Sequence, residues 1–321
     1  MRRIQMLVLF VLCSIASRFA HADIIASIPV GNPTGIAFSP AGDFYWATSF
    51  SGNYVVKIRA SDNVAVGTYS VGLNPTALTV TASFLGPSGD TVWVTNYGSN
   101  NVTRLDANTG ALLGTFPVGS GPRGIVWDGI SMWIANSVSN TVTRLDATTV
   151  GSGRLMGTFP VGVAPYGLTF NNNDKSIWVA NRNSNTVMKL SSALDSQGTI
   201  LGVYPVASQP QVLLWDGTNI WVSSYNSRAL TKLDGTTGAT LSVTTNLPAG
   251  PGAMVLGSSF SGPVIWVACY ASSTLAEVSV ASGAFLAAFT APSNPYGLIQ
   301  TPGGFAATSY TGNAVVVFFL R

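Results

Sequence analysis

The sequence predicts an all-β fold, a seven-bladed β-propeller with four-stranded antiparallel blades, and three observations support this prediction. A pattern of short apolar strands recurs every roughly 40–47 residues, which is the spacing of propeller blades. Clusters of Gly, Asn, Asp and Ser separate the strands, and no stretch has the periodicity of a helix. The strands are apolar on both faces, as expected where each blade packs between two neighbours.

The repeat is clearest in residues 91–116, TVWVTNYGSNNVTRLDANTGALLGTF. Residues 92–96, 101–106 and 111–116 are apolar or alternating and predict three strands, and a fourth follows at residues 124–127. The polar residues between them predict tight turns. The pattern then restarts, so one copy is one blade.

Seven copies follow one another along the chain when the sequence is aligned on the strand that contains tryptophan. Six of these strands contain a tryptophan, and the seventh, residues 305–309, has none. The six are Trp46, Trp93, Trp133, Trp178, Trp221 and Trp266. A second motif, Pro-Val-Gly-x-x-Pro-x-Gly, connects the copies and is clearest at residues 117–124 and 160–167. Seven copies predict seven blades.

The two ends of the chain complement each other. The seventh copy stops at residues 315–320, its third strand, and lacks an outer fourth strand. Residues 23–28, which precede a Pro-Val-Gly triplet, match the pattern of that missing strand. We therefore expect the N-terminal strand to complete the last blade and close the ring, so that residues 23–321 form one domain.

Residues 1–22 predict a cleaved signal peptide. Arg2 and Arg3 form a basic start, residues 4–16 are mostly apolar, and Ala20-His21-Ala22 matches a cleavage site after Ala22. The apolar run is too short to span a bilayer, so we expect no membrane insertion. The predicted location is the periplasm or the medium outside the cell.

Removal of this segment leaves a chain with no net charge. The precursor has 15 basic and 12 acidic side chains, and cleavage removes Arg2, Arg3 and Arg18. The balance excludes an electrostatic case for nucleic acid. Cleavage also removes Cys13 and the single histidine, so the mature chain has one cysteine, Cys269, and no internal disulfide.

Residues 92–104, 134–146 and 179–190 resemble the YVTN-type β-propeller repeat of bacteria and archaea, which is close to the NHL repeat. The resemblance covers essentially the whole mature chain. It extends to streptogramin lyases and to the large propeller subunits of periplasmic amine dehydrogenases. It implies the fold, but propellers have unrelated activities, so it does not imply a function.

The positions of the Asp residues predict a structural role in turns rather than a role in catalysis or metal binding. Most Asp residues fall in the two connections that meet on one face of a propeller, where Asp bonds nearby backbone amides. The single glutamate, Glu277, lies in a third strand, and Cys269 is expected to be a buried thiol. Without histidine or clustered acids, we expect no catalytic residue, no metal site and no cofactor.

The opposite face collects aromatic and basic residues. The positions after the Trp-containing strand and after the loop proline vary between blades, as a repeat protein varies the face that binds. The ten expected ligand-binding residues are Phe50, Tyr97, Arg123, Tyr166, Arg182, Gln211, Tyr225, Tyr270, Tyr296 and Tyr310. Tyr and Arg dominate recognition hot spots, and Arg can hold a carboxylate or a phosphate with two hydrogen bonds.

Four interpretations remain open at this stage. The aromatic residues could simply fill the gaps between blades. The chain could be a monomeric, non-enzymatic binding propeller for a small molecule, glycan, peptide or partner protein. It could be a lyase or lactone hydrolase related to streptogramin lyases, although it lacks their histidine base. It could also be a propeller subunit that docks on a separate redox enzyme.

Overall fold

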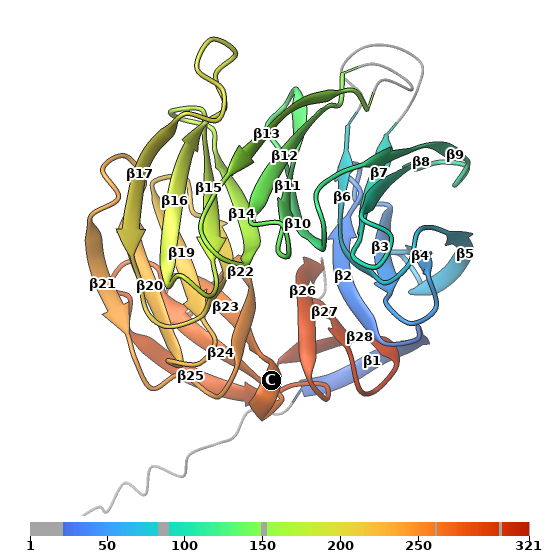
Figure 1. Cartoon of the computed structure of the whole chain (residues 1–321). Helices are drawn as coiled ribbons and strands as arrows, with labels where there is room; N and C mark the ends of the chain where they lie inside the picture. Colours follow the sequence, from blue (N-terminus) through green and yellow to red (C-terminus); the bar gives the residue numbers. More distant parts are fainter. Residues whose placement is uncertain (1–21, 83–89, 149–152, 261, 302–303, 321) are drawn as a thin grey trace, which may run out of the picture.

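The computed structural model is a closed ring of seven four-stranded antiparallel sheets, each of which is one blade (Figure 1). In each blade the first strand lies innermost, and these seven strands contact one another in cyclic order around a central channel. The predicted fold class is confirmed. The structure describes residues 22–82, 90–148, 153–260, 262–301 and 304–320.

The strands follow the repeat closely, with one short 3₁₀ helix in blade 6. Blades 1 and 2 consist of β2 (Pro33–Phe38), β3 (Phe44–Ser49), β4 (Tyr54–Arg59), β5 (Val64–Ser70), β6 (Pro75–Thr81), β7 (Thr91–Asn96), β8 (Asn101–Asp106) and β9 (Leu112–Pro117). Blades 3 and 4 consist of β10 (Pro122–Trp127), β11 (Ser131–Asn136), β12 (Thr141–Asp146), β13 (Leu155–Pro160), β14 (Pro165–Asn171), β15 (Ser176–Asn181), β16 (Thr186–Ser191) and β17 (Ile200–Pro205). Blades 5 and 6 consist of β18 (Pro210–Trp215), β19 (Asn219–Ser224), β20 (Ala229–Asp234), β21 (Thr240–Thr244), β22 (Pro251–Ser259), β23 (Gly262–Cys269), η1 (Tyr270–Ser272), β24 (Thr274–Ser279) and β25 (Phe285–Thr290). Blade 7 consists of β26 (Pro295–Thr301), β27 (Gly304–Ser309), β28 (Ala314–Leu320) and β1 (Ala22–Pro29).

The N-terminal strand closes the ring, as the sequence predicted. β1 pairs antiparallel with β28, from Ala22 opposite Leu320 to Pro29 opposite Ala314. In Figure 1 the blue β1 lies beside the red β28. Ile28 and Val30 are buried against residues of blades 7 and 1. The predicted signal peptide lies outside the described residues except for Ala22, which is the first residue of β1.

The core is divided into seven hydrophobic clusters, one between each pair of neighbouring blades. Each tryptophan of a second strand packs against the following blade. Trp133 of blade 3, for example, is fully buried and belongs to the cluster that contains Ile177 and Val179 of blade 4. Because the second strand of each blade is buried on both faces, apolar residues on both of its faces are expected. The outer fourth strands are partly exposed, with patterns of alternating burial.

The two faces of the ring have different connections. We call the face with the turns between second and third strands, and with the loops that lead into first strands, the top face. The opposite face is the bottom face. Every top turn between a second and a third strand has one residue with a left-handed backbone, and Asn tolerates this conformation well. In blade 2 this residue is Asn100 (φ 55°), which aligns with Asn140 of blade 3 and Asn185 of blade 4.

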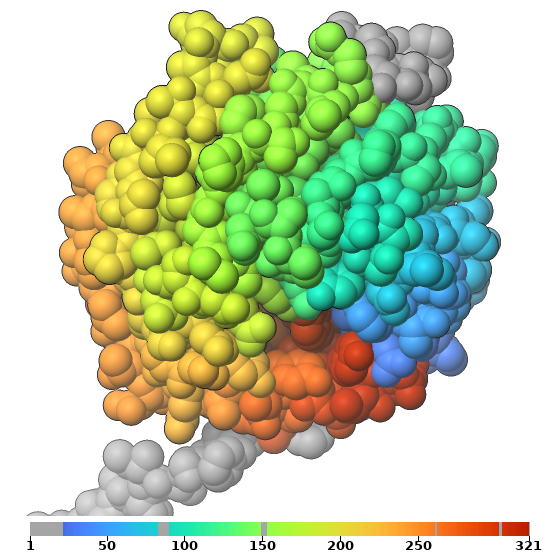
Figure 2. Space-filling model, in the orientation of Figure 1, coloured from blue at the N-terminus to red at the C-terminus, as the bar shows by residue number. Residues whose placement is uncertain are grey.

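Side chains fill the ring and leave its middle hollowed, where red atoms of blade 7 lie deeper than their neighbours (Figure 2). No helix among the described residues is long and apolar enough to cross a membrane.

Candidate functional site

The loop motif Pro-x-Gly sets the position of the residues at the top of the channel. The proline begins the first strand, and the glycine packs directly against the next inner strand. A Cβ atom on Gly124 would lie 2.4 Å from the carbonyl oxygen of Tyr166, and one on Gly167 would lie 2.3 Å from that of Gln211. Glycine is therefore required for the inner strands to approach this closely. The residue between proline and glycine, such as Arg123 or Tyr166, lines the opening of the central channel at the top face, which we call the mouth.

A pocket of about 380 Å³ opens at the top face around this mouth. Nine of the ten residues expected from the sequence line it. They are Phe50, Arg123, Tyr166, Arg182, Gln211, Tyr225, Tyr270, Tyr296 and Tyr310. The tenth, Tyr97, does not line the pocket, but its ring centroid lies 4.5 Å from the Cζ of Arg123. All ten side chains are half-buried, so they pack against their neighbours and also reach solvent.

One side of the pocket is cationic. The Arg123 guanidinium lies between two rings, 4.5 Å from the centroid of Tyr97 and 4.9 Å from that of Tyr166. The Cζ of Arg182 lies 5.6 Å from the same Tyr166 ring. Arg182 Nη2 donates to Gln209 Oε1 at 3.1 Å, while its buried Nε has no partner. Both guanidinium groups therefore retain donors for a ligand.

The other side of the pocket is a cluster of tyrosines from blades 6 and 7. The ring of Tyr270 lies 6.0 Å from that of Tyr296 and 6.4 Å from that of Tyr310. The hydroxyl of Tyr296 makes a hydrogen bond with the hydroxyl of Tyr166 from blade 4, across the channel. Burial, the neighbouring Tyr166 and this hydrogen bond raise the pKa of Tyr296 well above its ordinary value. Burial also raises the pKa of Tyr270. Tyr270 and Tyr296 are therefore neutral hydrogen-bonding groups at physiological pH.

An apolar cavity of about 260 Å³ continues below the pocket. It is lined by the first strands, with Ile36, Leu78, Ile125, Leu168 and Leu298 among the side chains. Tyr166 and Tyr296 line both this cavity and the pocket. Their hydrogen-bonded pair marks the boundary between a polar mouth and an apolar channel.

No carboxylate belongs to the residues that line the pocket. The predicted turn role of Asp is seen directly at Asp106, whose Oδ1 accepts from the amides of Asn108 and Thr109 at 2.9 and 2.7 Å. The hydroxyls of two threonines at the mouth are already used in hydrogen bonds between blades. Thr34 and Thr76 donate to the carbonyl oxygens of Pro75 and Pro122, each at 3.0 Å, and so join neighbouring blades.

The described residues contain no group of three or more His, Cys, Asp or Glu side chains that could hold a metal ion. Cys269 is fully buried, and burial raises the pKa of its thiol to about 12. A thiol with such a pKa is not a nucleophile near neutral pH. The expectation that Cys269 is a buried thiol is confirmed.

Sequence reasoning missed four residues of the site. Val212, Ala253 and Pro295 line the pocket with apolar surface, and Gln209 orients Arg182. The first three have no chemical signature, and only their strand position could have indicated them. Gln209 has a left-handed backbone (φ 58°) at the loop position where three other blades have Asn, so the repeat itself could have indicated it.

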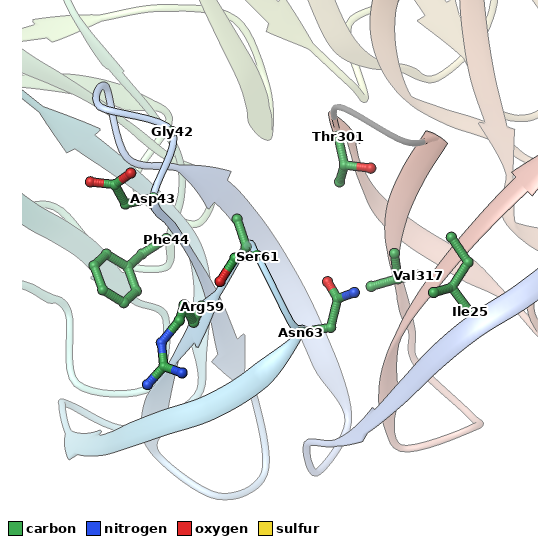
Figure 3. A pocket seen from close by; sticks show the side chains of 10 residues that line it. Ile25, Gly42, Asp43, Phe44, Arg59, Ser61, Asn63, Thr301 and Val317 are labelled. Atoms are coloured by element: carbon green, nitrogen blue, oxygen red, sulfur yellow. The ribbon is translucent and has the colours of Figure 1, made fainter.

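A larger cavity of about 630 Å³ lies on the bottom face, between blades 7 and 1 (Figure 3). Asp43, Phe44 and Arg59 of blade 1 line one side, and Thr301 and Val317 of blade 7 line the other. Its charged groups are already engaged in part, since Arg59 Nη1 bonds Asp62 Oδ2 at 2.7 Å. It has fewer convergent recognition groups than the top pocket.

Comparison with solved structures places the fold among known propellers. The chain is similar to a structure titled Kuenenia stuttgartiensis hydrazine synthase, with a TM-score of 0.74 and 17% identity over 92% of this chain and 97% of that chain. It is equally similar to a streptogramin B lyase, with a TM-score of 0.75 and 18% identity over 94% of this chain and 98% of that one. No family model and no curated protein matches the sequence. At these identities the likeness shows the propeller fold alone, and kinship to YVTN-type repeats stays a prediction.

Proposed function

We propose that the chain is an exported, non-enzymatic binding propeller that holds an anionic small molecule or peptide in the pocket at its top face. The carrying observation is the pair of guanidinium groups, Arg123 and Arg182, in a pocket of about 380 Å³ with no carboxylate in its lining. The guanidinium of Arg123 makes no hydrogen bond or ion pair with any described residue, and it lies against two tyrosine rings.

The chemistry of the pocket favours a carboxylate or a phosphate next to an aromatic or sugar ring. Arg presents parallel N–H donors that match the oxygens of such anions. The hydroxyls of Tyr270, Tyr296 and Tyr310 can hydrogen-bond the same ligand, and their rings offer faces for stacking. The residues at equivalent positions of the pocket differ between blades, so the pocket can bind an asymmetric ligand although the repeats are nearly equal.

The proposal is tested by a thermal-shift panel of carboxylates, phosphates and their neutral analogues on the mature chain. We expect anionic members to raise the melting temperature and their neutral analogues to have no effect. Calorimetry on the best member should show that Arg123→Ala or Arg182→Ala removes about 1–3 kcal/mol of binding free energy.

The matched control is Arg59→Ala, an exposed arginine of the bottom face that is paired with Asp62. It should leave affinity unchanged. If Arg123→Ala leaves affinity intact but lowers stability by several kcal/mol, the cationic side of the pocket serves packing between blades and the proposal fails.

A partner protein at the same face is the second candidate, and one observation favours it. Leu73, Val138 and Val163 lie in top-face loops of three neighbouring blades and are 54%, 60% and 50% exposed. Exposed apolar residues next to a recognition pocket are typical of a protein interface. Replacement of all three by Lys should abolish partner binding and leave the binding of a small anion intact.

The enzymatic alternative has less support. The single histidine, His21, falls in the predicted signal peptide, so the mature chain would have no imidazole base. Export itself is tested by N-terminal sequencing of the protein recovered from outside the cytoplasm, which should begin at Asp23.

A further inference from the structure

In five blades a lysine or arginine side chain lies over the ring of the tryptophan in the second strand. In each of them a Lys or Arg of the third strand lies directly opposite the tryptophan of the second strand. The pairs are Trp46 with Lys57, Trp93 with Arg104, Trp133 with Arg144, Trp178 with Lys189, and Trp221 with Lys232. The cationic atoms lie 4.9–5.6 Å from the ring centroids, within the range of cation–π attraction.

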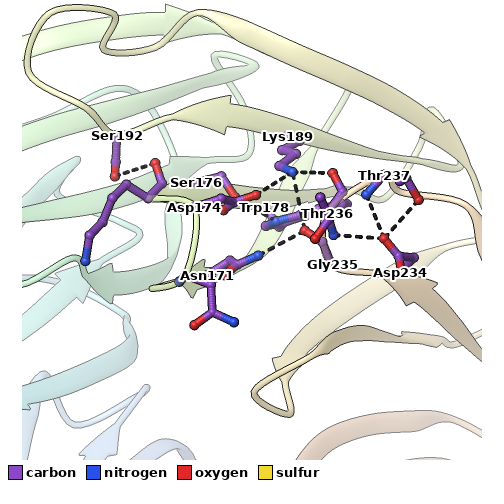
Figure 4. Close-up of polar contacts among 12 residues, drawn as sticks. Asn171, Asp174, Ser176, Trp178, Lys189, Ser192, Asp234, Gly235, Thr236 and Thr237 are labelled. Carbon is purple, nitrogen blue, oxygen red and sulfur yellow. Dashed lines mark hydrogen bonds and ion pairs between the residues drawn. The ribbon is translucent and has the colours of Figure 1, made fainter.

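These cations also bridge to the following blade. Lys189 of blade 4 donates to the carbonyl oxygens of Gly235 and Thr236 in blade 5, at 3.3 and 2.7 Å (Figure 4). Lys57 makes the equivalent bonds to Ala107 and Asn108 at 2.8 and 3.0 Å. At the bottom of these interfaces between blades, the face of a tryptophan ring and the carbonyl oxygens of the next blade therefore form a site for a positive charge.

Blade 6 has the tryptophan of the second strand, but the residue opposite it is acidic rather than basic. Trp266 lies opposite Glu277, the single glutamate of the chain. Glu277 is only 7% exposed, and its side chain makes no hydrogen bond or ion pair with any described residue. Burial of an unpaired carboxylate is costly, so this position favours a positive partner.

A cavity of about 700 Å³ occupies this interface between blades 6 and 7. Phe289 and Phe305 present their rings to Trp266 at centroid distances of 5.4 and 5.3 Å, both close to edge-to-face. The cavity lining includes Glu277, Gln300 and Phe260, and the Phe260 side chain is fully exposed. The carboxylate of Glu277, a residue that is 7% exposed, therefore lines a cavity with several aromatic rings.

We propose that this cavity binds an organic ammonium ion, which takes the place of the lysine or arginine of blades 1 to 5. Aromatic rings attract quaternary and primary ammonium groups through their faces, and the Glu277 carboxylate balances the charge. A metal ion fits less well, because hard cations need several oxygen ligands and the lining offers one carboxylate. This site is separate from the proposed anion pocket, since it lies on the bottom face and shares no residue with it.

The test uses choline as the probe and 3,3-dimethylbutan-1-ol as its uncharged isostere, by calorimetry on the mature chain. We expect saturable binding of choline and no binding of the alcohol. Glu277→Gln keeps the shape of the side chain but removes its charge, and should weaken choline binding at least tenfold. Glu277→Lys restores the residue type of the other blades and should abolish binding.

Folding of each variant is checked by its circular dichroism spectrum and melting temperature. Asp195→Asn, which neutralises an exposed bottom-face carboxylate outside the cavity, should leave choline binding unchanged. No saturable binding by the wild type, or equal binding by Glu277→Gln, overturns the proposal.

Discussion

At the scale of single residues, the loop before each first strand shows how neighbouring blades are joined. Asn32, Asn74 and Asn294 have left-handed backbones, and each donates its side-chain amide to a backbone carbonyl of the preceding blade. The acceptors are the residues that directly follow the second strands, such as Phe50 and Tyr270. Asn suits both requirements, because it tolerates positive φ and has a donor.

Ala164 occupies the same loop position in blade 4 with φ 54°, where alanine is strained and has no donor. We predict that Ala164→Asn stabilises the protein by about 1 kcal/mol, through relief of strain and a new bond to the carbonyl of Ser137. Urea denaturation measures the change. Asn74→Ala is the reciprocal variant and should destabilise by a similar amount, and an Ala164→Asn protein of unchanged stability would contradict the prediction.

Asp216 is a second residue with a measurable role. Its carboxylate accepts from Trp221 Nε1 at 2.7 Å and from the amides of Asn219 and Thr218 at 2.6 and 2.8 Å. Burial alone would raise the pKa of Asp216, but these hydrogen bonds outweigh it and lower the pKa. A lowered folded-state pKa means that the carboxylate stabilises the fold above its unfolded pKa near 3.9, and that this contribution is lost as the pH falls through the folded pKa.

We therefore predict that Asp216→Ala lowers stability by about 1–3 kcal/mol at pH 7 and by less near pH 2. Denaturant titrations at the two pH values measure the difference. Asp195→Ala, an exposed turn residue, should change stability by about 0.5 kcal/mol or less at both. A loss for Asp216→Ala that is equal at both pH values would mean that packing, rather than charge, is what the residue contributes.

At the scale of elements, a cation of the third strand can join one blade to the next, as Lys189 does. Lys189 is 5% exposed, and its Nζ bonds Asp174 Oδ2 at 2.6 Å in addition to the two carbonyls of blade 5 (Figure 4). We predict that Lys189→Met costs about 2–4 kcal/mol, because three acceptors lose a charged partner at a buried position. Thermal unfolding with a matched denaturant series measures this. Lys175→Met replaces an exposed lysine of the same blade and should be close to neutral.

The same elements show where sequence reasoning succeeded and where it stopped. The Trp-containing strands could be found from the sequence because both their faces are apolar. The register that sets Glu277 opposite Trp266 depends on strand pairing, which a single glutamate in a strand does not reveal.

At the scale of the whole molecule, repetition made the ring predictable. Seven copies and complementary ends determine the number of blades and the partner of the first strand. The variable positions also placed nine of ten expected residues around one pocket. The contact between Tyr166 and Tyr296 could not be predicted from the sequence, because the two residues are 130 positions apart. Its prediction requires the diameter of the channel and the directions of the side chains.

The closure of the ring leads to the last prediction. β1 contributes the outer strand of blade 7, and Ile28 and Val30 bury their side chains against Val315, Val317 and the neighbouring blade. Deletion of residues 23–30 would remove this apolar burial, worth about 1.5–3 kcal/mol for each large side chain, and would leave β28 as an exposed edge. We expect a much lower melting temperature and oligomers by light scattering.

A synthetic peptide of residues 22–30 provides the matched control for that deletion. Because its backbone and side chains can re-form the pairing of β1 with β28, it should restore part of the lost melting temperature and suppress the oligomers when added in trans. A peptide in which Ile28 and Val30 are replaced by Asp should do neither, since a buried charge would oppose docking. If the shortened chain instead stays monomeric and melts like the intact protein, the N-terminal strand does not hold the ring closed.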